Sequence, residues 1–261
     1  MAFRSSFPIL LAALAALFVM SYSALSAASV RERDSQTVVP AQPLPAPPPP
    51  TPEAPAPKAK PRPRPDIAIV RRTVPLRARP NGRVVARARA RTEFGGRRAL
   101  SVAARRGAWL GVVTPELPNG KLAWVHAGNR GLDFRRTAYS LHADLSGRWL
   151  ELRREGRILR RITVAVGRPG SETPTGRFAV TDKLRGTSYG PYYGCCVLAL
   201  NGHQPKLPAG WQGGDRLAIH GTNSPGTIGA AASAGCLRAA DADLEVLMRR
   251  VPLGTPVFIR N

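Results

Sequence analysis

The sequence has few of the residues that most often carry chemistry: three cysteines and four histidines among 261 residues. Three cysteines cannot all pair within one chain, so in an oxidising compartment one thiol is either intermolecular or reactive. Cys195 and Cys196 are adjacent, which makes Cys236 the odd one out. No further ligand residues are spaced near the adjacent pair, so we interpret it as buried packing or as a mutual disulfide, and we expect no metal site.

Acidic residues are also scarce, with 16 Asp and Glu against 39 Lys and Arg and a net charge of +23. A nucleic-acid partner is the usual reading of a sequence pI near 11.6. An exported protein seldom meets nucleic acid, and the amino terminus indicates export, so we expect no such partner. Anionic polymers, lipid head groups and peptide carboxylates are better candidates, and a merely solvated arginine surface is the alternative.

Long hydrophobic runs are absent except at the amino terminus. Arg4 precedes an apolar run over residues 7–20, and small residues follow at positions 24–29. This pattern predicts that residues 1–29 are a cleaved signal peptide. An uncleaved membrane anchor is the alternative, because weakly polar residues extend the run to about Val30, near the ~20 residues that a span needs. Both readings predict an exported protein, and no cysteine for lipid attachment lies near the run.

Proline, by contrast, is abundant, and it is concentrated in one segment. Residues 30–65 form a linker, of which residues 39–65 are the most proline-rich part. This composition cannot form a core, and it favours an extended polyproline II spacer.

Two folded regions are expected after the linker, at residues 66–131 and 133–261. The first has short alternating apolar runs broken by turn signals at positions 80–82 and 118–120, which predicts a small β-barrel. With Trp109 and Trp124, it resembles the bacterial SH3-like domains of envelope proteins. The second is also mostly strands, with one helix expected over 241–250 and a last strand over 256–259.

One stretch of the second region combines a histidine with the odd cysteine. The run LAIH predicts a buried strand that ends at His220, and a loop of small residues leads from there to Cys236. A histidine within hydrogen-bond reach of a cysteine can take its proton and hold an imidazolium–thiolate pair. Backbone N–H groups next to Gly235 can stabilise an oxyanion. These parts predict acyl transfer on a cysteine nucleophile.

Two motifs in this region carry a family resemblance. The residues HGT at 220–222 and SAGCLR at 233–238 resemble the active-site signature of the L,D-transpeptidases of YkuD type, and TPTGRF at 173–178 resembles a second motif of that family. The resemblance covers roughly residues 139–259. It implies a β-sandwich with one short helix, so the expected fold class is mainly β, a small SH3-like barrel followed by an L,D-transpeptidase sandwich.

The resemblance also implies roles for individual residues. Cys236 would be the nucleophile and His220 its base, with the carbonyl of Gly221 as third member and the N–H groups of Gly235 and Cys236 as oxyanion donors. Arg238 would steady the loop or a substrate carboxylate. Many members have histidine where this chain has Ala234, which leaves Ser233 as the only side-chain donor there. The substrate-binding candidates are Ser233, Arg238, Thr222, Tyr193 and His203.

The function that the resemblance implies is an enzyme of the cell envelope, in the periplasm or wall. It would act on peptidoglycan stem peptides, release D-alanine from a tetrapeptide and form 3-3 cross-links, without cofactor or metal. Anionic wall polymers are further candidate partners, and carbapenem-type β-lactams are the expected inhibitors. An L,D-carboxypeptidase and a wall-binding protein with an inactive catalytic domain are the alternatives, and the oligomeric state stays open.

Overall fold

The computed structural model describes residues 66–261, which lie in a single compact unit of the chain (Ala59–Asn261). The expected signal or anchor (1–29) and the linker (30–65) lie outside the described residues. Within residues 66–261, no helix is long and apolar enough to cross a bilayer.

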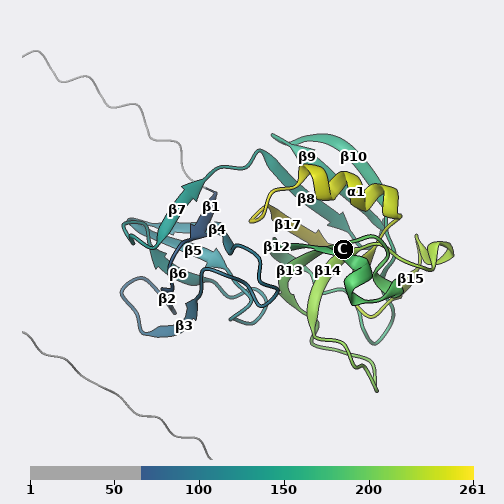
Figure 1. Ribbon diagram of the computed structural model, residues 1–261, viewed down its shortest axis with the longest axis horizontal. Helices are drawn as coiled ribbons and strands as arrows, with labels where there is room; N and C mark the ends of the chain where they lie inside the picture. Colours follow the sequence, from purple (N-terminus) through teal and green to yellow (C-terminus); the bar gives the residue numbers. More distant parts are fainter. Residues whose placement is uncertain (1–65) are drawn as a thin grey trace, which may run out of the picture. The chain divides into compact units, whose positions relative to one another are not determined.

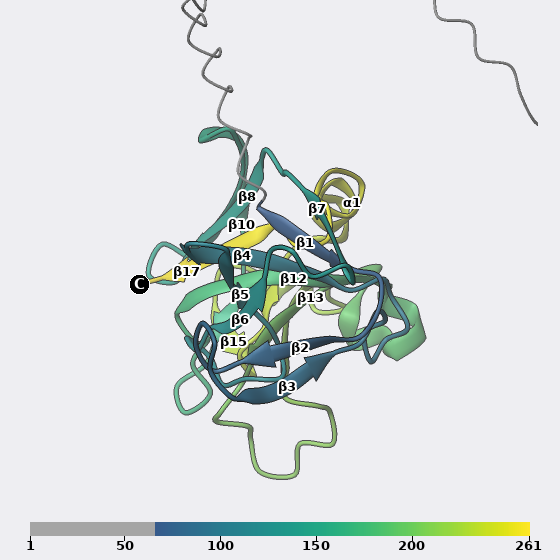
Figure 2. The same ribbon diagram turned by 90° about the vertical axis from the view of Figure 1, so that its left-hand side faces the viewer.

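The first part of this unit is a seven-stranded sheet whose neighbouring strands are all antiparallel. Its order is β3-β2-β6-β5-β4-β1-β7, and Figure 2 shows β2 and β3 side by side at one edge. The strands are β1 (Ile67–Val70), β2 (Val74–Arg77), β3 (Val84–Ala88), β4 (Ala99–Arg106), β5 (Trp109–Val113), β6 (Ala123–His126) and β7 (Leu132–Arg135).

Alternating apolar residues form this sheet's own core, in which Leu110 and Val112 are 1% and 0% exposed. Asn81 and Gly120 have positive φ values of 56° and 77°, within the two expected turns. The sheet extends to Arg135, beyond the boundary that we placed at residue 131, because β7 pairs with β1 and buries Leu132 in the same core. The SH3-like character of this part stays a prediction.

The second part is an eight-stranded sheet of order β10-β9-β8-β17-β12-β13-β14-β16, accompanied by a parallel ribbon of β11 and β15. Figure 1 shows β12, β13 and β14 next to one another in this sheet. Its strands are β8 (Tyr139–Asp144), β9 (Trp149–Arg154), β10 (Arg157–Thr163), β12 (Gly176–Arg185), β13 (Cys196–His203), β14 (Arg216–His220), β16 (Leu237–Arg238) and β17 (Pro256–Arg260). The ribbon consists of β11 (Val166–Gly167) and β15 (Ala231–Ser233), and three 3-10 turns are η1 (Gly186–Tyr189), η2 (Pro191–Tyr193) and η3 (Pro225–Thr227).

The eight-stranded sheet curls around a single hydrophobic core. Ile162 of β10 and Leu237 of β16 come from opposite edges of the sheet, yet both belong to one buried cluster. The expectation of a mainly β fold with one helix is confirmed.

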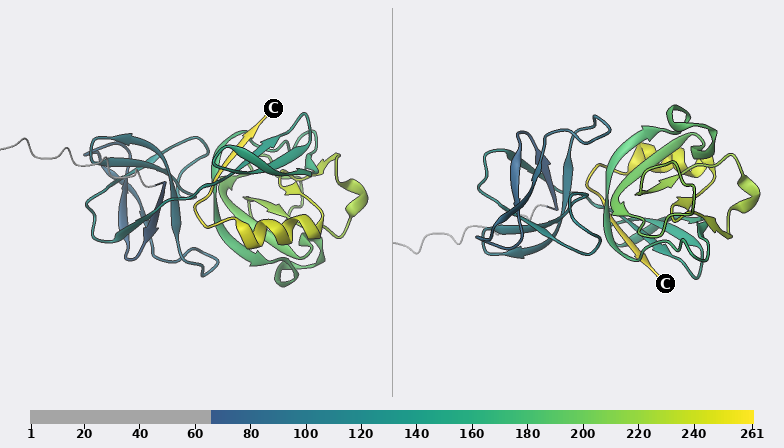
Figure 3. Two further views of the ribbon diagram at one scale, coloured as in Figure 1. Left: turned by 90° about the horizontal axis from the view of Figure 1, so that it is seen from above. Right: turned by 90° about the horizontal axis from the view of Figure 1, so that it is seen from below.

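The helix α1 (Asp241–Arg250) has the range that the sequence predicted. Leu244 and Leu247 are fully buried, and the helix packs against β13 and β14. Figure 3 shows it lying along one side of the second sheet. Asp241 in the first turn suits the helix dipole, and the chain leaves the helix just before Pro252. This packing fixes the start of α1 close to the end of β14, where the candidate site lies.

Polar contacts connect loops of the first sheet with the second. The Asn119 side chain donates to the carbonyl of His203 at 2.7 Å and accepts from its N–H at 2.9 Å. The Thr92 hydroxyl donates to buried Asp182 at 2.5 Å. Residues of the first sheet therefore stand next to the strand that precedes β14.

Candidate active site

His220 stands at the end of β14, as the sequence predicted, and is 0% exposed. Leu217 and Ile219 are buried in the core of the second sheet, so alternation along the strand puts His220 on the opposite face. Its Nδ1 lies 2.6 Å from the carbonyl oxygen of Gly221, and because a carbonyl only accepts, Nδ1 carries the hydrogen. In the neutral ring Nε2 then holds the free lone pair, and it is buried with no hydrogen-bond partner among the described residues.

Cys236 lies directly before β16, which runs parallel to β14. Ile219 pairs with Leu237 and both face the core, so the residues on either side of them, His220 and Cys236, face the other way. The residue is partly exposed and lines a small cleft, and its sulfur lies 4.0 Å from the carbonyl oxygen of Arg216. The structure thus brings the expected nucleophile and base to the same face of adjacent strands.

Burial sets the protonation of both groups. Removal from water raises the pKa of Cys236 to about 11, against smaller opposite effects of the Ala218 amide and the Arg238 charge. Removal from water also lowers the pKa of His220 to about 4, and the Gly221 carbonyl opposes this only in part. The free site therefore holds a thiol and a neutral imidazole near pH 7. Burial thus disfavours both charges of the expected imidazolium–thiolate pair, which stays a prediction.

The loop before the nucleophile is braced from within. The buried hydroxyl of Ser233 donates to the carbonyl of Cys236 at 2.6 Å and accepts the N–H of Gly235 at 3.0 Å. The Gly235 N–H is therefore engaged, which corrects its expected role as an oxyanion donor. The Cys236 N–H has no hydrogen bond among the described residues and stays available. Ser233 acts on the loop and not, as we expected, on substrate.

Gln204 ties this loop to the segment before the TPTG motif. Its side-chain nitrogen donates to the carbonyls of Ser171, Glu172 and Ala234 at 3.0–3.2 Å. The side chain is 5% exposed. Gln204 was not predicted as a site residue, because an isolated glutamine after His203 gives no indication of a structural or functional role.

Arg238 is 4% exposed, and its Nε and Nη2 lack hydrogen-bond partners among the described residues. Its guanidinium lies 5.6 Å from the ring centroid of Tyr192, and it lines a cavity of about 320 Å³ together with Arg168 and Trp211. A buried cation with unused donors is suited to a carboxylate. The expected alternatives for Arg238 were the loop and a substrate carboxylate, and this arrangement favours the carboxylate.

Two tyrosines of η2 cover the imidazole. The ring centroids of Tyr192 and Tyr193 lie 5.5 and 4.9 Å from that of His220. Both also line the cleft of Cys236, together with Trp211. Burial raises the pKa of Tyr193, and the nearby Cys236 adds to the effect. Tyr193 thus lies where a substrate-binding residue is expected. Tyr192 was not predicted, although the aromatic run before the cysteine pair could have indicated it, and Trp211 had no such signal.

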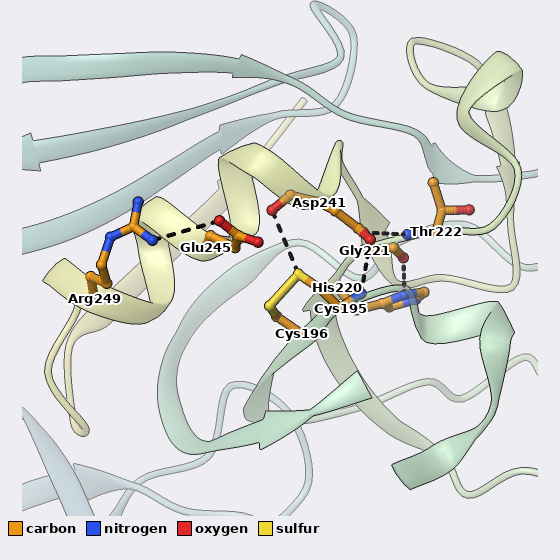
Figure 4. Close-up of a disulfide and its surroundings, with 8 residues drawn as sticks. All are labelled: Cys195, Cys196, His220, Gly221, Thr222, Asp241, Glu245 and Arg249. Carbon is orange, nitrogen blue, oxygen red and sulfur yellow. Dashed lines mark hydrogen bonds and ion pairs between the residues drawn. A yellow bond between two sulfur atoms is a disulfide. The ribbon is translucent and has the colours of Figure 1, made fainter. Parts of the chain in front are cut away.

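Cys195 and Cys196 form a disulfide beside the base (Figure 4). The carboxylate of Asp241 accepts the Cys195 N–H at 3.0 Å and the Thr222 N–H at 3.3 Å, and the Gly221 N–H donates to the Cys196 carbonyl at 3.0 Å. These bonds hold the peptide whose carbonyl orients His220. Asp241 had been noted only as a helix-terminal charge.

Two further substrate-binding candidates have other roles in the structure. The Thr222 hydroxyl accepts the N–H of Ser224 at 3.0 Å, so Thr222 braces the chain after the base. His203 faces the Asp215 carboxylate at 2.9 Å and the Pro115 carbonyl at 2.8 Å, and it does not line the Cys236 cleft. The structure thus places Tyr193 and Arg238 beside the reacting groups and leaves His203 outside.

The site combines the Cys236 thiol and its backbone N–H with a buried imidazole on the same face of the adjacent strand. Tyr192, Tyr193 and Trp211 line the cleft, and the buried guanidinium of Arg238 offers a positive charge nearby. Such a set can attack a carbonyl and store the acyl group as a thioester.

Residues 138–259 match the family model described as "L,D-transpeptidase catalytic domain" (YkuD). The YkuD protein of Bacillus licheniformis, whose name describes it as an L,D-transpeptidase, is 33% identical over 121 residues, which are 46% of this chain and 65% of the relative. The YkuD protein of Bacillus subtilis strain 168, named likewise, is 32% identical over 125 residues, 47% of this chain and 66% of the relative. The matched region thus spans just under two thirds of the length of these relatives.

Among solved structures, an L,D-transpeptidase from Mycobacterium smegmatis has a TM-score of 0.39 at 19% identity, covering 56% of this chain and 69% of its own. A Mycobacterium tuberculosis L,D-transpeptidase 3 bearing a faropenem-derived adduct has a TM-score of 0.40 at 17% identity, covering 53% and 66%.

Proposed function

We propose that the chain is an exported enzyme that transfers acyl groups between peptidoglycan stem peptides, because residues 138–259 match the model of the YkuD L,D-transpeptidase catalytic domain. The observation that carries the proposal is the shared face of β14 and β16, on which His220 and Cys236 both lie, with Cys236 lining the adjoining cleft. The case for export rests on the sequence of residues 1–29.

Acylation begins with proton transfer from the Cys236 thiol to Nε2 of His220 as sulfur attacks the carbonyl of the third stem residue. The Gly221 carbonyl holds Nδ1–H and stabilises the imidazolium that forms. The Cys236 N–H donates to the oxyanion. When the carbon–nitrogen bond breaks, the imidazolium returns the proton to the leaving amine of D-alanine, which leaves a thioester.

Transfer follows by the reverse sequence. The amine of a second stem attacks the thioester, His220 accepts a proton from that amine, and the thiol is restored on Cys236. The product is a 3-3 cross-link. With water in place of the amine, the same site acts as an L,D-carboxypeptidase, so the acceptor alone separates the two activities.

Carbapenem-type β-lactams are the proposed inhibitors. The strained lactam carbonyl takes the place of the stem carbonyl, and Cys236 opens the ring to form a thioester. The expected adduct is on Cys236 alone, because Cys195 and Cys196 are joined in a disulfide.

The testing experiment is incubation of the full chain with a purified disaccharide-tetrapeptide, followed by mass analysis. Release of D-alanine with dimer formation supports transpeptidation, whereas release without dimers supports the carboxypeptidase. Cys236→Ala is the control, and it should release no D-alanine. A wild-type protein that releases none would point to a wall-binding protein with an inactive catalytic domain.

A further inference from the structure

A second cavity, of about 620 Å³, opens beside the catalytic cleft. It is lined by Arg87, Arg89, Arg91, Thr92, Glu93, Arg98, Pro115, Glu116, His203, Asp215 and Arg216. Asp215 and Arg216 also line the cleft of Cys236, so the two spaces adjoin. The chemistry described above uses none of the residues that the first sheet and its loops contribute to this lining.

The most distinctive feature of the cavity is a row of three arginines. Arg87 lies in β3, Arg89 follows the end of that strand and Arg91 follows a bend at Ala90, and all three line the cavity. All three are exposed. Like charges that line one cavity repel one another, because solvent screens them fully only beyond a Debye length of about 8 Å at physiological ionic strength. An anion bound between these arginines would reduce their mutual repulsion.

No carboxylate of the described residues pairs with this row, although three line the cavity. Glu116 pairs with Arg98 at 2.7 Å, Asp215 lies 2.9 Å from His203, and Glu93 pairs with Arg216.

Among these three arginines, Arg91 makes a side-chain hydrogen bond to an uncharged acceptor: its Nη1 donates to the Gly95 carbonyl at 2.8 Å. The cavity therefore keeps an excess of positive charge, in the form of guanidinium groups that match carboxylates and phosphates.

We propose that the arginine row of Arg87, Arg89 and Arg91 binds a carboxylate of the stem peptide whose reacting carbonyl lies at Cys236. The inference rests on the proposed function and adds a specificity subsite supplied by the first sheet. Because the cavity adjoins the Cys236 cleft, one peptide can reach both spaces, which favours a stem peptide over a separate phosphate polymer as the ligand. The carbonyl of Arg216 lies 4.0 Å from the Cys236 sulfur, and the side chain of the same residue lines the cavity.

The test measures binding to the full chain carrying Cys236→Ala, which prevents turnover. The probes are a soluble tetrapeptide stem with free carboxylates and the same peptide with its carboxylates amidated. In the triple variant Arg87→Gln, Arg89→Gln, Arg91→Gln, the Kd of the free peptide should rise about tenfold, and the Kd of the amidated peptide should change little. The matched control removes three exposed arginines outside the cavity: Arg130→Gln, Arg136→Gln and Arg157→Gln.

Equal Kd values for the free peptide in the triple variant and the control would overturn the assignment. So would an unchanged peptide Kd accompanied by lost binding of a poly(glycerol phosphate) chain, because the row would then serve a phosphate polymer. Turnover of the disaccharide-tetrapeptide by wild type is assayed separately. If the row governs peptide binding while wild type releases no D-alanine, the proposed function fails and the subsite stands.

Discussion

The Nδ1–H of His220 donates to the carbonyl oxygen of the next residue, Gly221, at 2.6 Å. A backbone carbonyl fixes the tautomer as a carboxylate would, but it brings no net charge to stabilise an imidazolium before substrate arrives. The effect of burial on the pKa of His220 therefore exceeds that of the carbonyl, and the imidazole of the free protein is neutral near pH 7. Two hydrogen bonds fix the position of this carbonyl. The Gly221 N–H donates to the Cys196 carbonyl, and the Thr222 N–H, in the same peptide as the Gly221 carbonyl, donates to the Asp241 carboxylate.

A protonated resting thiol predicts slow alkylation of the native protein. Because burial raises the pKa of Cys236 to about 11, iodoacetamide at pH 7 should react roughly 10²-fold more slowly than with a free thiol, and the rate should keep rising above pH 9. Labelling rates across pH, followed by intact mass, measure this. Fast labelling at pH 6 would instead reveal an imidazolium–thiolate pair.

His220 should also make stability depend on acidity. Its folded pKa, about 4, is below the ordinary 6.5, so the unfolded chain takes up the proton first as the pH falls. The stability present above pH 6.5 is thus lost progressively down to pH 4, by about 3 kcal/mol. His220→Gln removes this loss. Denaturant unfolding of both proteins at pH 7 and pH 4 should show the variant less sensitive to acid, and parallel pH profiles would contradict the assignment.

The disulfide predicts a definite thiol count. Alkylation in denaturant without reductant should add one group per chain, at Cys236, and prior reduction should raise the number to three. In Cys236→Ala the unreduced count should be zero. Three labelled thiols without reductant, in protein made in an oxidising compartment, would show that the pair is reduced.

The sequence predicted those parts of the site that depend on neighbours along the chain. Apolar alternation located β14 and the histidine at its end, and helical periodicity gave α1 residue for residue. Contacts between distant segments had no such signal: Gln204 reaches Ala234 across 30 residues, and Asp241 reaches Cys195 across 46. The burial that shifts the pKa values of His220 and Cys236 is likewise a property of the folded chain and has no signal in the sequence.

Gly235 is required by two independent features of the loop. Its φ is +117°, and an added Cβ would lie 1.9 Å from the side-chain nitrogen of Gln204. Gly235→Ala should therefore displace the nucleophile and lower turnover by at least tenfold. Gly107→Ala is the control for a methyl group added at a positive φ without a contact, because its φ of +55° lies in the left-handed region open to L residues and its Cβ would meet nothing within 4 Å. Adding Gln204→Ala to Gly235→Ala tests the contact: no recovery of turnover would leave backbone strain as the cause.

Arg238 should lower the stability of the free protein and strengthen the binding of substrate. Its guanidinium is 4% exposed with Nε and Nη2 unpaired, so the folded protein bears a desolvated cation that substrate alone can complement. Arg238→Met replaces it with an apolar side chain and should raise the Tm of the free protein while raising KM for the tetrapeptide. Arg168→Met is the control, since Arg168 lines the same cavity but is exposed, and its Tm should not rise. Thermal unfolding and steady-state kinetics on the same preparations check both halves. A lowered Tm for Arg238→Met would mean that the guanidinium holds the loop together, and an unchanged KM would remove it from substrate binding.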